Sequence, residues 1–108
     1  MRARWQAGRQ GTGYEKLRLF VGGRVDLWLL RFPPGSYIPE HRDEVPRGRH
    51  LRLNLVLKSA RRGGEFSCPA PLINRPRLKL FRSDLHTHAV SRVEEGTRWV
   101  LSCGVLLP

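Results

Sequence analysis

Residues 50–57 read His-Leu-Arg-Leu-Asn-Leu-Val-Leu, and this stretch carries the clearest structural signal in the chain. Leucine occupies every odd position from 51 to 57, whereas positions 52, 54 and 56 hold arginine, asparagine and valine. Successive side chains of an extended strand point to opposite faces, whereas a helix would repeat every 3.6 residues. The stretch therefore predicts a β-strand with a leucine face and a mixed face.

The segments on either side show short apolar runs separated by glycine and proline, with little helical periodicity. Residues 17–21 and 25–32 flank Gly22-Gly23, which predicts a hairpin. Gly63-Gly64 allows a reversal of the chain, and the prolines between residues 69 and 76 predict a loop. Further strands are expected over residues 78–81, 87–93 and 97–107. Seven or eight strands of this kind predict an all-β sandwich or barrel, with the first 16 residues as a frayed or helical lead-in.

Length and composition limit the classes of protein that the chain can belong to. With 108 residues and 12.4 kDa, residues 1–108 are expected to form a single domain. Charged residues interrupt the apolar run from 17 to 32, so no membrane segment or export signal is indicated and a cytoplasmic protein is expected. The two cysteines are expected to be reduced.

Charge points to an anionic partner without identifying it. The formal net charge is +11 at pH 7, and the basic residues are spread along the whole chain. Such a surface attracts polyanions such as nucleic acids. It equally serves solubility, and both interpretations remain open at this stage.

The first chemical signal is the sequence His41-Arg42-Asp43. Residues i and i+2 of an extended segment point to the same side, so the imidazole and the carboxylate could bind one metal ion. Taken alone, such a pair is common in surface loops. His88 is the natural third ligand, because a closed barrel brings distant strands together and two histidines with one carboxylate form the facial triad of Fe(II) sites. Arg98 follows His88 by ten residues and offers a bidentate clamp for a carboxylate.

Five segments together resemble a known family. They are Arg31-Phe-Pro-Pro-Gly35, His41-Arg-Asp43, Leu53-Asn-Leu-Val-Leu57, Gly63-Gly-Glu-Phe66 and His88-Ala-Val-Ser-Arg-Val-Glu-Glu-Gly-Thr-Arg98. In order and spacing this succession resembles the prolyl-hydroxylase-like branch of the Fe(II)/2-oxoglutarate oxygenases. The resemblance covers about residues 30–105, and the block from His88 to Arg98 is its most specific part.

The resemblance implies a minimal double-stranded β-helix, the jelly-roll or cupin-like barrel, in which His41, Asp43 and His88 bind Fe(II) as the catalytic centre. Arg98 would hold the distal carboxylate of 2-oxoglutarate. The implied activity is that of a dioxygenase that uses 2-oxoglutarate and dioxygen to hydroxylate a C–H bond and releases succinate. The substrate is unidentified; a short chain with an open cleft and a charge of +11 suggests an acidic protein or a nucleic acid.

Several residues depart from the family pattern or compete for a role. Phe32 stands where the family often has tyrosine, so Asn54, or Arg52 on the same strand face, is expected to supply the missing polar contact to the cosubstrate. His86 shares strand parity with His88, but a spacing of twelve residues to Arg98 would leave the family block, and His88 is preferred. A family proline is replaced by arginine at position 92, and His50 is expected at a surface or strand edge.

The sequence is compatible with three function classes. The leading one is the Fe(II)- and 2-oxoglutarate-dependent dioxygenase. The second is a non-catalytic cupin-like metal-binding domain, which keeps the metal ligands but has no use for Arg98 as a clamp. The third is a basic nucleic-acid-binding β-barrel that uses stacking aromatic residues and no metal. An exposed sheet edge in so small a barrel would favour a homodimer.

Overall fold

The computed structural model describes residues 5–8 and 11–108, and their regular structure consists of β-strands. In chain order the strands are β1 (Trp5–Ala7), β2 (Glu15–Gly22), β3 (Val25–Phe32), β4 (Ile38–His41), β5 (Arg49–Lys58), β6 (Arg62–Gly63), β7 (Phe66–Ser67), β8 (Ile73–Asn74), β9 (Leu78–Arg82), β10 (His88–Val90), β11 (Val93–Glu95) and β12 (Arg98–Leu107). No helix among these residues is long and apolar enough to cross a membrane.

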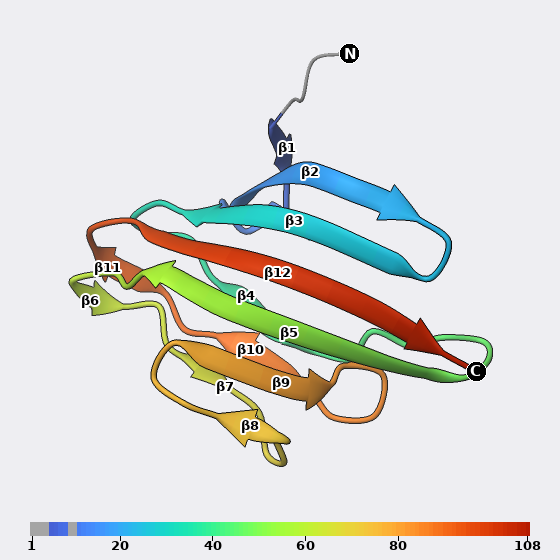
Figure 1. Ribbon diagram of the computed structural model, residues 1–108. Helices are drawn as coiled ribbons and strands as arrows, with labels where there is room; N and C mark the ends of the chain where they lie inside the picture. The colour runs from blue at the N-terminus through green and yellow to red at the C-terminus, as the bar shows by residue number, and fades with distance from the viewer. Residues whose placement is uncertain (1–4, 9–10) are drawn as a thin grey trace.

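The strands form two facing layers, and all pairings are antiparallel (Figure 1). The large sheet has the strand order β1-β2-β3-β12-β5-β9-β8, and behind it lies a small sheet with the order β4-β10-β7. A short β11-β6 pair forms a third sheet. The architecture is a small jelly-roll or cupin-like barrel, which confirms the predicted fold class.

Most of the predicted strands are confirmed. The hairpin predicted around Gly22-Gly23 is β2–β3, and Gly23 takes a left-handed φ of 59° that a side chain with a Cβ rarely adopts. The leucine-alternating stretch is β5, which pairs with β12 on one side and β9 on the other. β5 and β12 are each ten residues long and lie side by side in the middle of the large sheet.

The predicted helical or frayed lead-in is wrong for its described residues. Residues 5–7 form β1, which pairs with the start of β2 and extends the large sheet by one strand; residues 1–4 and 9–10 lie outside the described residues. The predicted strand at 87–93 is two strands, because the chain passes from β10 in the small sheet to β11, which pairs with β6. The proline-containing loop includes the two-residue strand β8. Short strands of this kind depend on their partners and leave little pattern in the sequence.

The core lies between the two layers. It is a cluster of Tyr14, Phe32, Val56, Val90, Val93 and Val100, all buried. On β5, the inward face is the one that carries Arg52, Asn54 and Val56, whereas Leu53, Leu55 and Leu57 are exposed. The more hydrophobic face of this strand therefore points away from the barrel interior.

Candidate metal centre

The two predicted histidine ligands lie opposite each other on neighbouring strands. His41 ends β4, His88 begins β10, and the two are Cα partners in the antiparallel pairing of these strands. Asp43 follows two residues after His41, and its backbone N–H donates to the Ser83 carbonyl oxygen at 2.8 Å. Strand register and this hydrogen bond thus bring together ligands from distant parts of the chain.

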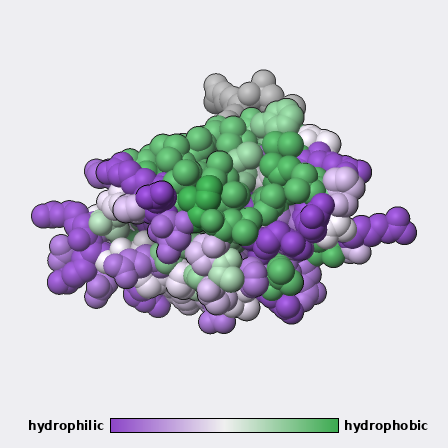
Figure 2. Space-filling view, turned by 60° about the horizontal axis from the view of Figure 1, so that its bottom comes forward, coloured by the Kyte–Doolittle hydropathy of each residue, from purple (hydrophilic) through white to green (hydrophobic). Residues whose placement is uncertain are grey.

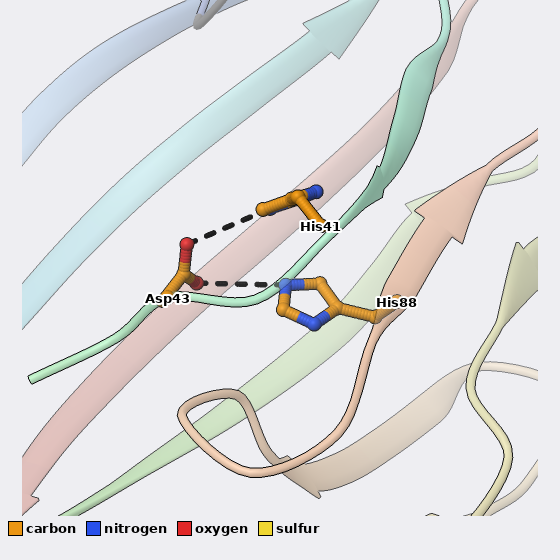
Figure 3. A group of neighbouring side chains, drawn as sticks. All are labelled: His41, Asp43 and His88. Carbon is orange, nitrogen blue, oxygen red and sulfur yellow. Dashed lines mark ion pairs between the residues drawn. The ribbon is translucent and has the colours of Figure 1, made fainter.

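The three side chains point toward one another (Figure 3). The distance from His41 Nε2 to Asp43 Oδ1 is 3.5 Å, and that from His88 Nε2 to Asp43 Oδ2 is also 3.5 Å. One ligand atom from each residue lies within 4.8 Å of the other two. The side chains of His41 and His88 are 11% and 8% exposed, so the imidazoles are shielded from water while Asp43 is 26% exposed.

Backbone carbonyls determine which nitrogen of each imidazole faces the carboxylate. His41 Nδ1 lies 2.8 Å from the Pro39 carbonyl oxygen, and His88 Nδ1 lies 3.1 Å from the His86 carbonyl oxygen. A carbonyl oxygen can only accept, so Nδ1 carries the hydrogen in both rings. In the neutral rings, the lone pair of Nε2 is therefore directed at the oxygens of Asp43. A metal ion placed between them could be bound by all three side chains.

The residues fit a divalent transition metal. Metal–nitrogen and metal–oxygen bonds of about 2.0–2.2 Å place neighbouring ligand atoms about 3 Å apart in an octahedral site. The two separations of 3.5 Å are close to this requirement. Hydrogen bonds from the second ring nitrogen to backbone carbonyls are the usual outer-shell support of metal-binding histidines. His86 contributes its carbonyl oxygen to this support, and its ring is outside the ligand cluster found among the described residues.

A cavity of about 430 Å³ opens beside the triad, and Arg98 lines it as well. Arg98 begins β12 and is only 4% exposed. No carboxylate or carbonyl of the described residues pairs with its guanidinium, which lies 4.9 Å from the centre of the Phe32 ring. Burial lowers the pKa of Arg98 to about 10. The side chain is thus a buried cation beside the candidate metal site.

The two other predicted cosubstrate contacts also line this cavity but have protein partners. Arg52 donates to Asp26 Oδ1 at 2.9 Å and to the Ser102 hydroxyl at 2.9 Å. The Ser102 hydroxyl in turn donates to Asn54 Oδ1 at 2.6 Å. Arg52 is therefore held in an ion pair, whereas the amide nitrogen of Asn54 has no hydrogen-bond partner among the described residues.

The cavity wall also includes residues that were not predicted to line it, among them Tyr14, Lys16, Trp28 and His50. The Tyr14 ring stacks on Phe32, with centroids 5.0 Å apart. Strand parity could have revealed His50, because it shares the even face of β5 with Arg52 and Asn54. Tyr14 falls in the segment predicted as a lead-in, where no pattern placed it.

His50 is linked to the region that positions Asp43. Its Nδ1 is hydrogen-bonded to the hydroxyl of Ser83, the residue whose carbonyl oxygen accepts from Asp43 N–H. Burial, with the nearby Arg52 charge, lowers the pKa of His50. A neutral His50 at the cavity wall is therefore favoured; it is half-buried near the start of β5 and lies outside the ligand cluster found among the described residues.

Comparisons with known proteins identify the fold. No family model matches the chain, and no curated protein matches it. Solved structures do match it. A chain of the complex of Rhodobacter sphaeroides SigE with the anti-sigma ChrR aligns with a TM-score of 0.58 and 24% identity, over 94% of this chain and 49% of that one.

Two other solved structures are described as cupins. The Schizosaccharomyces pombe Cnp3 cupin domain aligns with a TM-score of 0.63 and 9% identity, over 86% of this chain and 61% of that one. A sugar phosphate isomerase of the cupin superfamily from Silicibacter pomeroyi aligns with a TM-score of 0.59 and 17% identity, over 98% and 69%. The chain has the cupin fold. It spans 49% to 69% of the length of these three proteins, and at such identities the likeness concerns the fold alone.

Proposed function

We propose that this protein is a cupin-fold metal-binding domain that holds one Fe(II) ion between His41, Asp43 and His88. The proposal rests on one observation. Nε2 of His41 and Nε2 of His88 both face the Asp43 carboxylate, while both Nδ1 atoms are hydrogen-bonded to backbone carbonyl oxygens. Two imidazoles and one carboxylate suit Fe(II) and leave coordination positions for further ligands. The adjoining cavity gives such ligands access.

Anaerobic titration with Fe(II) tests this proposal. We expect one ion per chain for the wild type and for His86→Ala, and a loss of affinity of at least about 100-fold for His88→Ala. His86→Ala is the matched control, because its backbone carbonyl is retained while the rival imidazole is removed. Equal losses in the two variants, or tight binding in His88→Ala, would refute the assignment of the ligands.

A second candidate function, a 2-oxoglutarate-dependent dioxygenase, is favoured by one observation: the buried guanidinium of Arg98 that lines the same cavity as the triad. In such an enzyme the bound iron would supply the oxidative chemistry. Arg98 would bind the distal carboxylate of 2-oxoglutarate, because a carboxylate is the partner that this cation lacks. Asn54 would donate from its amide nitrogen, and Arg52 would stabilise the wall through its pairing with Asp26.

Addition of 2-oxoglutarate to the anaerobic Fe(II) protein separates the two candidates. A visible charge-transfer band, followed in air by release of succinate, is expected of the dioxygenase and not of a simple metal-binding domain. Arg98→Met should keep the iron and weaken 2-oxoglutarate binding by about 2–4 kcal/mol, which is at least about 30-fold. Replacement of the exposed Arg47 by Met is the matched control and should change neither. Absence of the band in the iron-loaded wild type would exclude the dioxygenase.

A further inference from the structure

A second cavity lies at the end of the barrel away from the candidate metal centre. Its volume is about 360 Å³, and its wall includes Ser59, Gly64, Lys79 and Arg98. The three candidate metal ligands do not line it. Ser59 directly follows β5, whereas the first cavity, beside the triad, is lined by His50 at the beginning of the same strand. The two cavities therefore lie toward opposite ends of β5 (Figure 1).

The guanidinium of Arg98 borders an open space. Although Arg98 is only 4% exposed, it lines both cavities. Every fully buried side-chain nitrogen or oxygen of the described residues has a hydrogen-bond partner. The guanidinium nitrogens have no such partner in that part of the chain, so they are not fully buried and must border a cavity. A charge that is shielded from bulk water is costly without an anion, and an anion in the cavity would stabilise it.

Lys79 adds another positive charge to the second cavity. Its Cα partner is Asn54, which belongs to the inward face of β5, so the Lys79 side chain points inward as well. The ammonium donates to the neutral Asn74 Oδ1 at 2.7 Å. Ser59 contributes a hydroxyl, and Glu65 is the one acidic residue of the wall, where it is exposed to solvent. The cavity wall therefore has a surplus of positive charge.

Exposed basic residues surround the second cavity. Lys58 ends β5, and the Arg77 guanidinium donates to a carbonyl oxygen of the same strand end at 3.2 Å. Arg61 is exposed just before β6. The two carboxylates of β11 are both paired with Arg62. Figure 2 shows hydrophilic side chains gathered at the left of the molecule, where β6 and β11 lie in Figure 1. Charges of one sign around a cavity raise the local concentration of ions of the opposite sign.

A phosphate group fits the second cavity better than a carboxylate does. Phosphate carries up to two negative charges at neutral pH, and its oxygens can accept from a guanidinium, an ammonium and a hydroxyl at once. A carboxylate offers one charge and two oxygens, which leaves part of this donor set unused. A volume of about 360 Å³ holds a small molecule but not a nucleic-acid strand. The ligand class is thus free phosphate or a small phosphate ester.

We propose that the second cavity is a phosphate-binding site in which Arg98, Lys79 and Ser59 bind the phosphate group of a small molecule. The phosphate supplies the negative charge that the two cations lack, and the surrounding basic residues attract it to the entrance. The site uses none of the candidate metal ligands, so the metal-free chain should bind phosphate too.

Calorimetric titration of the metal-free protein with inorganic phosphate tests the site. The wild type should bind one phosphate per chain with saturation. Lys79→Met should weaken binding by at least about tenfold, because one of the two charges is lost. The matched control Lys16→Met removes a lysine that lines the first cavity and should bind phosphate like the wild type. A wild type without saturable binding, or equal losses in the two variants, would overturn the proposal.

A gain in affinity provides a test that a damaged fold cannot imitate. Glu65→Gln removes the opposing charge of the wall and should tighten phosphate binding about twofold or more. Unchanged or weaker binding in this variant would place the anion elsewhere. His88→Ala should bind phosphate like the wild type, so failure of the metal assignment is distinguished from failure of this site.

Competition identifies the source of the phosphate group. Tighter binding of glycerol 3-phosphate than of inorganic phosphate would identify an ester as the ligand, and the reverse order would identify the free ion; both orders support the site. A single-stranded oligonucleotide without terminal phosphates should not displace inorganic phosphate, because a strand cannot enter the cavity. Displacement by the oligonucleotide would contradict a site for small molecules.

Discussion

The imidazoles of His41 and His88 are each oriented by the backbone carbonyl two residues earlier in the chain, Pro39 and His86. This local bond holds Nδ1 as a donor and turns Nε2 toward Asp43. Each ring thus reaches the site already in the tautomer that binds metal. The sequence predicted the three candidate ligands because strand parity agreed with the spacing of the family that the chain resembles. It could not predict their orientation, which depends on backbone positions.

The buried charge of Arg98 destabilises the folded chain. Burial lowers its pKa to about 10, and at about 1.4 kcal/mol per tenfold change in proton affinity this corresponds to roughly 3 kcal/mol of unfavourable free energy in the folded chain. The unfolded chain binds more protons between the lowered pKa of the folded state and the higher ordinary pKa of an arginine. The penalty is therefore fully present at neutral pH and is lost only as the pH rises through that window.

We therefore predict that Arg98→Met stabilises the protein in the absence of anions. The contact of the guanidinium with the Phe32 ring offsets the penalty by about 1 kcal/mol, so the expected gain in the free energy of unfolding is about 1–2 kcal/mol. Urea denaturation at neutral pH measures it. A loss of stability larger than about 1 kcal/mol would mean that the folded protein already stabilises this charge.

At the scale of elements, β5 and β12 are held together on their inner face by a polar network. Gly104 leaves room for it, since a Cβ at that position would lie 2.3 Å from Arg52 Nη2 and 2.6 Å from Asp26 Oδ2. The side chains of Arg52 and Asp26 are 19% and 25% exposed, so their ion pair is largely shielded from water. The close approach explains why a glycine interrupts the apolar run of β12.

Gly104→Ala is predicted to destabilise the protein by about 2–3 kcal/mol, because the methyl group separates a shielded ion pair. Thermal or urea unfolding measures the loss. In an Asp26→Leu, Arg52→Leu background the same substitution should cost less than about 1 kcal/mol, since no ion pair remains to be broken. If Gly104→Ala destabilises that background as much as it destabilises the wild type, the requirement for Gly104 comes from backbone conformation instead.

The sequence of β5 does not determine which of its two faces points inward. Its alternation predicted a strand correctly, but hydropathy does not say which face points inward when both faces carry apolar side chains. In the structure the mixed face points inward, because Asn54 and Arg52 line the cavity, and the leucines lie outside. A polar inner face on a central strand is thus a sign of a functional cavity.

For the whole molecule, the cupin barrel follows from many short strands separated by glycine and proline, and the resemblance in motif order and spacing indicated the candidate ligands within it. Strands of two or three residues escaped prediction, because their partners determine them. An acidic protein or nucleic acid as substrate, a basic nucleic-acid-binding function and a cytoplasmic location all stay predictions. The structure adds a cavity beside the candidate metal site on one side of the large sheet and an apolar face on the other.

Anomalous diffraction from crystals grown anaerobically with Fe(II) tests the central claim most directly. The account predicts one strong iron peak per chain, at about 2.0–2.3 Å from Nε2 of His41, Nε2 of His88 and a carboxylate oxygen of Asp43. An iron peak bound by other residues, or none at this position in crystals shown to contain iron, would contradict it.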